Sequence, residues 1–415
     1  MKKVLLALLL CLASVSVPAG AQARSDDYKR VAYFIQWGVY GRNFHVKDLD
    51  TSGAAAKLTH VNYAFGFVNA AGDCYSSDEW ADWQRPVPAE QSVDGVADAP
   101  GQALNGNMNQ FRKLKAKYPD LKLHISLGGW TGSKYFSDAV LTAESRAKLA
   151  RSCVDLWLRG NLPGAAPGTG AGVFDGIDLD WEWPGSSGAP GNVIRPEDKR
   201  NFTLFTAELR RQMREFSRTA QLTAFLPAAT AKIDAGIEVP QVFRLLDFAT
   251  VQGYDLHGPW SLTTGHNGNL FTDRRNPEPV KYSVDQTVRD YLSRGAPAHK
   301  IVVGIPAYGQ GWTGVTAGGT GLYQQATGAA PGKWGPGGED YKDLVNKPGK
   351  RFRDARTGAH WLYDGKEFWS YDDPAVMLQK ANYIRHRDLG GYMMWSIDQD
   401  DARASLTSAL YSVLH

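Results

Sequence analysis

Cysteine is scarce in this chain of 415 residues, which contains only 3. Cys11 lies in an apolar N-terminal stretch, so Cys74 and Cys153 are the two that remain for the rest of the chain. Two cysteines cannot form a thiolate metal cluster, and the 9 His residues show no H-x-x-x-H or H-E-x-x-H spacing. We therefore expect no metal ion and no cofactor. The two cysteines could pair in an oxidising compartment, but their spacing does not test the geometry that a disulfide needs.

An excess of charge of one sign is also absent. Lys and Arg total 46 and Asp and Glu total 43, which gives a formal net charge of +3. Proteins that bind nucleic acids normally carry a strongly basic face, and no run of Lys or Arg indicates one in this sequence. We expect no nucleic-acid partner. With 21% charged and 43% hydrophobic residues, the composition is also not that of a disordered chain.

Long hydrophobic runs are missing apart from residues 4–12 near the N-terminus. Lys2 and Lys3 precede this run, and the small residues of Ala21-Gln22-Ala23 follow it. This order is typical of a secretory signal peptide, in this chain residues 1–23, which is removed on export. A membrane anchor is the alternative, but a helix needs roughly 20 apolar residues to span a bilayer. We expect a secreted, extracellular or periplasmic protein that does not enter the membrane.

Low-complexity tracts and linkers are absent too, and short apolar runs alternate instead with amphipathic stretches. Eight runs rich in Val, Ile, Tyr, Phe or Leu are candidate strands: 31–36, 60–68, 122–127, 173–182, 222–226, 248–254, 300–307 and 391–397. The clearest helical patterns between them are 106–118, 143–159, 196–219, 284–294 and 374–387. Pro196 and Pro374 stand where a first helical turn tolerates proline. This alternation predicts an α/β protein, a (β/α)8 barrel over residues 24–415.

Two connections are too long for simple loops. Residues 69–105 follow the second predicted strand, and residues 310–372 follow the seventh. The second connection contains alternating segments of its own, which predict a small α+β subdomain inserted in the barrel. Both connections start at the carboxyl ends of strands, where barrel enzymes place their active sites.

The acidic residues of greatest interest lie in the fourth predicted strand, within residues 174–185. Because side chains alternate along a strand, Asp178, Asp180 and Glu182 share one face while the apolar residues between them share the other. In a barrel the acidic set would project inward, about 6.6 Å apart along the strand, close enough for neighbouring carboxyls to hydrogen-bond. Such a column predicts coupled titration with at least one carboxyl protonated near neutral pH. Glu182, the last of the three, would reach the open end as a general acid of the kind that cleaves glycosidic bonds.

Two other interpretations of this acidic run are weaker. A solvated surface would not be interleaved with apolar residues such as Ile177, Leu179 and Trp181. A calcium-binding loop of the D-x-D-x-D-G type has its glycine after the third acid, whereas Gly176 precedes Asp178. The pattern favours catalysis.

The segment Asp175-Gly176-Ile177-Asp178-Leu179-Asp180-Trp181-Glu182 resembles the D-G-x-D-x-D-W-E signature of family 18 glycoside hydrolases, the chitinases and their relatives. Other segments resemble motifs of this family in the same chain order, so the resemblance extends from about residue 30 to about residue 405. They are Asn62-Tyr63-Ala64-Phe65, Ser126-Leu127-Gly128-Gly129-Trp130, Tyr254-Asp255-Leu256-His257-Gly258, Pro306-Ala307-Tyr308-Gly309 and Met394-Trp395-Ser396. The resemblance also implies that residues 310–372 correspond to the α+β insertion found in one chitinase subfamily.

The resemblance implies a substrate-assisted mechanism with net retention, which is an exception to the usual paired-carboxylate mechanism. In this family the N-acetyl oxygen of the substrate attacks the anomeric carbon and an oxazolinium ion forms. By analogy, Glu182 protonates the leaving oxygen and later activates water. Asp180 would move between Asp178 and the acetamido N–H, and Tyr254 would hydrogen-bond the acetamido oxygen. Asp175 lies on the other face of the strand and is expected to be structural.

The resemblance and the aromatic content, which includes 13 Trp, together indicate a sugar-binding groove. Trp395 would form the floor beneath the distorted sugar, lined by Tyr33 and Phe65, and Asp255 would position that sugar. The full set of expected substrate-binding residues is Tyr33, Trp37, Phe65, Trp130, Gln252, Asp255, Trp260, Tyr308, Trp312 and Trp395. Trp183 ends a predicted strand on the same side. Gln252 and Gln310 depart from the commonest family residues, Met and Arg, which leaves the preference for particular sugars open.

Three functions are compatible with these features. The favoured one is a secreted, monomeric, endo-acting chitinase whose partners are chitin and N-acetylglucosamine oligosaccharides. The second is an endo-β-N-acetylglucosaminidase that acts on glycoprotein glycans, which shares the acidic motif. The third is a chitin-binding protein on the same fold, disfavoured because Glu182, Asp180 and Asp178 are all present. The inserted segment, which would form one wall of a groove, favours a linear polymer.

Overall fold

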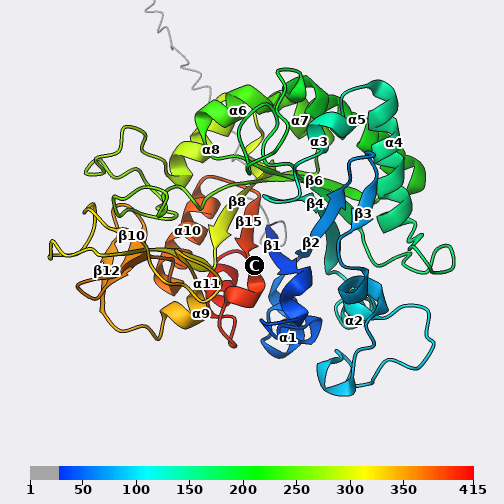
Figure 1. The fold of residues 1–415 in the computed structure, drawn as a ribbon, viewed down its shortest axis with the longest axis horizontal. Helices are drawn as coiled ribbons and strands as arrows, with labels where there is room; N and C mark the ends of the chain where they lie inside the picture. The colour runs from blue at the N-terminus through cyan, green and yellow to red at the C-terminus, as the bar shows by residue number, and fades with distance from the viewer. Residues whose placement is uncertain (1–27) are drawn as a thin grey trace, which may run out of the picture.

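The computed structural model describes residues 28–415, and the signal peptide predicted over residues 1–23 lies outside them. Eight parallel strands follow the order β1-β15-β8-β7-β6-β5-β4-β2, and pairing of β1 with β2 closes the barrel. The predicted (β/α)8 barrel is thereby confirmed (Figure 1). The strands are β1 (Lys29–Ile35), β2 (His60–Val68), β4 (Lys122–Gly128), β5 (Gly176–Asp180), β6 (Gln221–Leu226), β7 (Phe248–Val251), β8 (Ile301–Pro306) and β15 (Gly391–Trp395).

Helices surround the barrel on its outer side, as Figure 1 shows for α4, α5 and α7. The five predicted helices correspond to α2 (Gly106–Lys117), α4 (Ala143–Cys153), α5 (Asp198–Phe216), α8 (Val284–Ser293) and α10 (Pro374–His386). Pro374 opens α10 as expected, but Pro196 lies in a turn before α5. The other α-helices outside the second sheet are α1 (Val46–Thr51), α3 (Phe136–Ala139), α6 (Thr230–Gly236), α7 (Val239–Leu245) and α11 (Ser405–Tyr411). No helix within residues 28–415 is long and apolar enough to cross a membrane.

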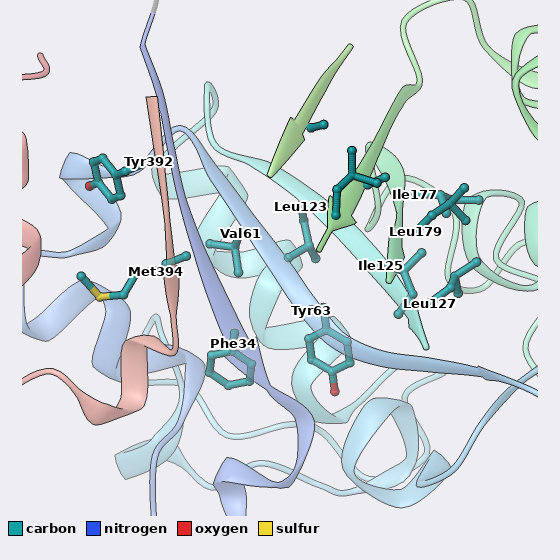
Figure 2. Packing of buried hydrophobic residues seen from close by; sticks show 14 of the residues in the cluster. Phe34, Val61, Tyr63, Leu123, Ile125, Leu127, Ile177, Leu179, Tyr392 and Met394 are labelled. Atoms are coloured by element: carbon teal, nitrogen blue, oxygen red, sulfur yellow. The ribbon is translucent and has the colours of Figure 1, made fainter. Parts of the chain in front are cut away.

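The main hydrophobic core lies between the barrel strands and these helices. Figure 2 shows part of it, with Ile177 and Leu179 of β5 beside Ile125 and Leu127 of β4. The parallel register pairs Ile125 with Ile177 and Leu127 with Leu179, so alternate residues of both strands are fully buried on this side. Because side chains alternate along each strand, the residues between them point into the barrel, where the polar groups of the site lie.

A second sheet follows β8, the seventh barrel strand, and lies beside the barrel (Figure 1). Its strands are β9 (Tyr308–Thr313), β10 (Gly328–Ala329), β11 (Gly338–Asp340), β12 (Lys350–Asp354), β13 (Ala359–Tyr363) and β14 (Phe368–Ser370), with the short helix α9 (Tyr341–Leu344). All of its pairings are antiparallel, and it has a separate apolar core that includes Trp312, Trp361 and Phe368. The subdomain boundaries at 310 and 372 stay a prediction.

Cys74 and Cys153 are paired in a disulfide, which resolves the question that the sequence left open. Their Cα atoms are 5.0 Å apart, within the usual range for this bond. Cys74 begins β3 (Cys74–Ser76), which pairs antiparallel with the end of β2, and Cys153 ends α4. The bond therefore fixes the long connection after β2 to the outer helical layer.

Candidate active site

The acidic column lies on β5 and just beyond it. The strand is shorter than predicted and ends at Asp180, so Glu182 lies two residues past its end, at the carboxyl-terminal opening of the barrel. Asp178 is fully buried and Asp180 is 3% exposed, whereas Glu182 is partly exposed. Burial thus decreases along the column toward the opening.

Asp178 is held by hydroxyl groups from three other strands of the barrel. The register places Ser126 of β4 and Thr223 of β6 on either side of it. Ser126 Oγ donates to Asp178 Oδ2 at 2.8 Å, and Thr223 Oγ1 donates to Oδ1 at 2.6 Å. Tyr33 OH, from β1, also donates to Oδ2 at 2.8 Å. These hydroxyls, rather than a neighbouring carboxyl, take the hydrogen-bonding positions, which differs from the contact expected between adjacent acids and fixes Asp178 in place.

Asp180 is less well satisfied. Its Oδ1 is buried and has no hydrogen-bond partner among the described residues. Burial, together with the nearby charges of Glu182 and Asp178, raises the pKa of Asp180 well above its ordinary value. The backbone beside it is tightly packed, because a Cβ at Gly128, whose φ is +115°, would lie 2.2 Å from Asp180 O. Asp180 is therefore a carboxyl with a free oxygen on a rigid support.

Glu182 is fixed by its backbone, which leaves its carboxyl free to face the opening. Glu182 N donates to Ser133 Oγ at 2.8 Å, and Asn192 Nδ2 donates to Glu182 O at 2.9 Å. Burial and the charge of Asp255 raise the pKa of Glu182 to about 8, while Lys232 opposes this rise. The raised pKa favours the protonated form of Glu182 at neutral pH, at the opening of the barrel.

Two cavities meet at Glu182. A cavity of about 250 Å³ is lined by Asp180, Tyr254 and Trp395, and a larger one of about 680 Å³ adjoins it. Residues that line both are Trp130, Glu182, Gln252 and Asp255. The smaller cavity is also lined by Trp37, Phe65, Thr131, Phe225 and Tyr308, and the larger by Trp183, Ala228, Ala229, Lys232, Leu256, Trp260 and Tyr282. A carboxyl with a raised pKa thus lies where two adjoining cavities meet.

Several predicted aromatic residues present flat surfaces to these cavities. Trp37, Trp130 and Trp260 are 41%, 48% and 66% exposed. Trp395 and Phe65 stack with ring centroids 5.7 Å apart, and together they line the smaller cavity. Trp183 is almost fully buried but lines the larger one. Wide aromatic faces beside a few polar groups are typical of a site that binds sugar rings.

Two residues predicted to bind substrate do not line either cavity. Trp312 is fully buried in the core of the second sheet, where β9 pairs it with Phe368 of β14. The prediction for Trp312 is wrong, because its ring has no surface to offer a ligand. Tyr33 is 1% exposed and lies behind Trp395, with ring centroids 5.0 Å apart, so it contacts Asp178 and not the cavity.

Asp255 is oriented by the second sheet, which the sequence did not reveal. Tyr308 OH donates to Asp255 Oδ1 at 2.6 Å, and Gln310 Nε2 donates to the same oxygen at 2.7 Å. Asp255 N donates to Asn267 Oδ1 at 2.8 Å, and the residue has a φ of +52°. Burial raises the pKa of Asp255, and the hydrogen bonds from Tyr308 and Gln310 oppose this rise. Gln310 therefore acts on the site through Asp255.

Sequence reasoning also missed Lys232, Phe225 and Tyr282 among the lining residues. Phe225 is on β6 and stacks with Tyr254, with ring centroids 5.9 Å apart. It is two residues from Thr223 and so shares the inward face of β6, but no feature of the sequence indicated a contact with a ligand. Lys232 lies in α6, directly after β6, and its position at the carboxyl end of a barrel strand is the one signal that could have identified it.

The fold and site are those of a (β/α)8 barrel with a column of acidic side chains at the carboxyl ends of its strands. Residues 29–400 match the family described as glycosyl hydrolases family 18, so the chain belongs to that family. It is similar to Chitinase C of Streptomyces lividans, with 39% identity over 381 residues, which are 90% of this chain and 57% of that protein. Chitinase 63 of Streptomyces plicatus is 38% identical, and the match covers 93% of this chain and 60% of that protein. The chain thus spans less than two thirds of these relatives.

Solved structures agree with this assignment. The catalytic domain of psychrophilic chitinase B from Arthrobacter TAD20 has 43% identity and a TM-score of 0.90, with 94% of this chain and 96% of that chain covered. A family 18 N-acetylglucosaminidase from Paenibacillus barengoltzii has 29% identity and a TM-score of 0.72, with 93% and 99% covered.

Proposed function

We propose that the protein is a secreted chitinase that hydrolyses β-1,4 linkages between N-acetylglucosamine units. The observation that carries this proposal is the position of Glu182, a carboxyl with a raised pKa, where the two aromatic-lined cavities meet. A polymer that passes through both cavities has a glycosidic oxygen at this point. The chitinases among the similar proteins support the choice of substrate. Secretion and a monomeric state belong to the same proposal.

The proposed mechanism assigns one role to each polar group around the smaller cavity. Glu182 donates its proton to the leaving oxygen, while the acetamido oxygen of the sugar in the smaller cavity attacks the anomeric carbon. Asp180, whose Oδ1 has no partner among the described residues, accepts the acetamido N–H and stabilises the positive charge of the oxazolinium ion. Tyr254 hydrogen-bonds the acetamido oxygen. Asp178, whose carboxyl is fixed by three hydroxyl groups, acts on Asp180 through its nearby negative charge. Glu182 then removes a proton from the water that attacks the anomeric carbon and opens the oxazolinium ring. The configuration at the anomeric carbon is thereby retained.

Activity is expected to fall at alkaline pH as Glu182 loses its proton. The general acid acts in its protonated form, so kcat/KM is maintained below the pKa of Glu182 and declines as the pH rises through about 8. A profile of kcat/KM against pH with a soluble N-acetylglucosamine oligosaccharide measures this limb. A decline that begins near the ordinary glutamate value of 4.5 would contradict the raised pKa.

Substitutions of Trp260 and Trp312 are expected to have different effects, the first on KM and the second on the free energy of unfolding. Trp260→Ala removes a ring that is 66% exposed beside the larger cavity, so we expect KM to rise about two- to tenfold with an unchanged melting temperature. Trp312→Ala leaves a cavity in the second sheet and is expected to lower the free energy of unfolding by about 3–5 kcal/mol. Thermal melts and oligosaccharide kinetics on both variants test this. A KM effect without destabilisation in Trp312→Ala would restore that residue to the binding surface.

An endo-β-N-acetylglucosaminidase on glycoprotein glycans is the second candidate, because the same acid and acetamido chemistry would serve it. The similarity to a family 18 N-acetylglucosaminidase supports this second candidate. The experiment that separates the two compares sugar release from colloidal chitin and from a high-mannose glycoprotein. We expect release from chitin, and activity on the glycan alone would overturn the chitinase proposal. Binding to chitin without cleavage of either substrate would instead indicate a chitin-binding protein.

A further inference from the structure

Lys232 lines the larger cavity, Asp180 and Trp395 line the smaller one, and Glu182 lines both. It belongs to the first turn of α6, and its Nζ is 5.4 Å from the centroid of the Trp183 ring. Within residues 28–415 its ammonium group takes part in no hydrogen bond and no ion pair; its contacts are the face of Trp183 and the electrostatic interaction with Glu182. Lys232 therefore offers free N–H donors and a positive charge to whatever occupies this cavity.

The negative groups nearby do not neutralise this charge by direct contact. Asp255 also lines the cavity, but Tyr308 and Gln310 donate to its Oδ1. Glu182 is the other carboxyl in the lining, and its raised pKa favours the protonated form at neutral pH. The remaining lining residues are aromatic, aliphatic or neutral amide groups. A partly buried cation beside a protonated acid thus dominates the polarity of this wall.

On the proposed function, the larger cavity receives the sugar on the leaving side of the bond that is cut. We propose that Lys232 is a specificity-determining residue that favours N-acetylglucosamine over glucosamine at this leaving-side position. An ammonium group donates hydrogen bonds to neutral oxygens, such as those of hydroxyl or acetamido groups. The free amine of glucosamine, when protonated, carries a like charge into a partly desolvated cavity and is repelled. Lys232 therefore selects in two ways: it donates hydrogen bonds to N-acetylglucosamine, and it repels protonated glucosamine.

The test uses a partly deacetylated chitosan as the substrate, at a pH at which its free amines are protonated. Each cleavage converts the leaving-side sugar into a new non-reducing end, so the ratio of glucosamine to N-acetylglucosamine at these ends reports the selection directly. The wild-type protein is compared with Lys232→Met and Lys232→Gln, which remove the charge, and with Lys232→Arg, which keeps it. Lys199→Met is the matched control, because Lys199 Nζ donates to Asp234 O of α6 but lines neither cavity.

We expect ends rich in N-acetylglucosamine from the wild type, and a ratio about fivefold higher in Lys232→Met and Lys232→Gln. Lys232→Arg and Lys199→Met should keep the wild-type ratio. Because both kinds of end come from one digest, any effect of Lys232 on Glu182 cancels in the ratio. An unchanged ratio in both charge-removing variants would overturn the inference while leaving chitin hydrolysis intact. If the wild type also fails to cut fully acetylated oligosaccharides, the proposed function itself fails, and this inference fails with it.

Discussion

Replacing Glu182 with Gln is expected to lower kcat for an N-acetylglucosamine oligosaccharide by about 10²- to 10⁴-fold. The amide is nearly isosteric with the carboxyl, but it cannot donate a proton to the leaving oxygen or accept one from water. Since Glu182 is held through its backbone by Ser133 and Asn192, the substitution should leave the local fold unchanged. We expect similar melting temperatures and oligosaccharide affinity for the two proteins.

The exposed residue Glu90 provides the control for this substitution, because Glu90→Gln makes the same chemical change at a side chain that lines neither cavity. Initial-rate kinetics on purified wild type and both variants measure the effect. If Glu182→Gln retains more than about a tenth of the wild-type kcat, Glu182 is not the general acid.

The second large effect is expected for Asp180→Asn, with a fall in kcat of about 10²-fold. Asp180 is buried on β5 with a free Oδ1, and the amide at this place cannot stabilise a developing positive charge. The charge of Glu182 raises the pKa of Asp180. Because two interacting carboxyls titrate as a pair, we expect the removal of Asp180 to lower the pKa of Glu182. The alkaline limb of the kcat/KM profile should therefore move to lower pH in this variant.

Asp175→Asn is a matched control for that experiment. Asp175 precedes β5, and its Oδ2 accepts from Leu123 N at 2.8 Å and pairs with Lys115, away from both cavities. This agrees with the structural role expected for Asp175 from its place on the other face of the strand. We expect a lower melting temperature for Asp175→Asn and an unshifted pH profile. An equal loss of kcat in both Asp variants would show that the effect at Asp180 is one of stability.

The barrel could be predicted because its eight strands are apolar runs that alternate with amphipathic helices. Strand ends were less accessible to sequence reasoning. The run 173–182 stays apolar and acidic throughout, yet β5 ends at Asp180, where Gly129 N donates the last hydrogen bond to Asp180 O. The residue types in such a run do not show at which position the strand stops pairing with its neighbours. Pro196 similarly looks like a first helical residue, but the chain completes a turn before α5 begins.

The site residues divide in the same way. Asp178, Asp180 and Glu182 could be aligned from the two-residue repeat, since their order along β5 and the two residues after it also sets their depth. Trp312 could not be assigned correctly, because its burial comes from pairing with Phe368 of β14, a residue far along the chain. Gln310 and Lys232 lie far along the chain from the residues they affect. Gln310 of β9 hydrogen-bonds Asp255, and Lys232 of α6 interacts electrostatically with Glu182. Periodicity carries no information on such contacts.

The measurement that tests the central claim most directly is the anomeric form of the first products from an N-acetylglucosamine oligosaccharide. If the acetamido group of the substrate is the nucleophile and Glu182 the acid, the initial product is the β-anomer, and Glu182→Gln forms it far more slowly. Products that appear first as the α-anomer would mean that water attacks directly, and would contradict the proposed roles of Asp180 and Tyr254.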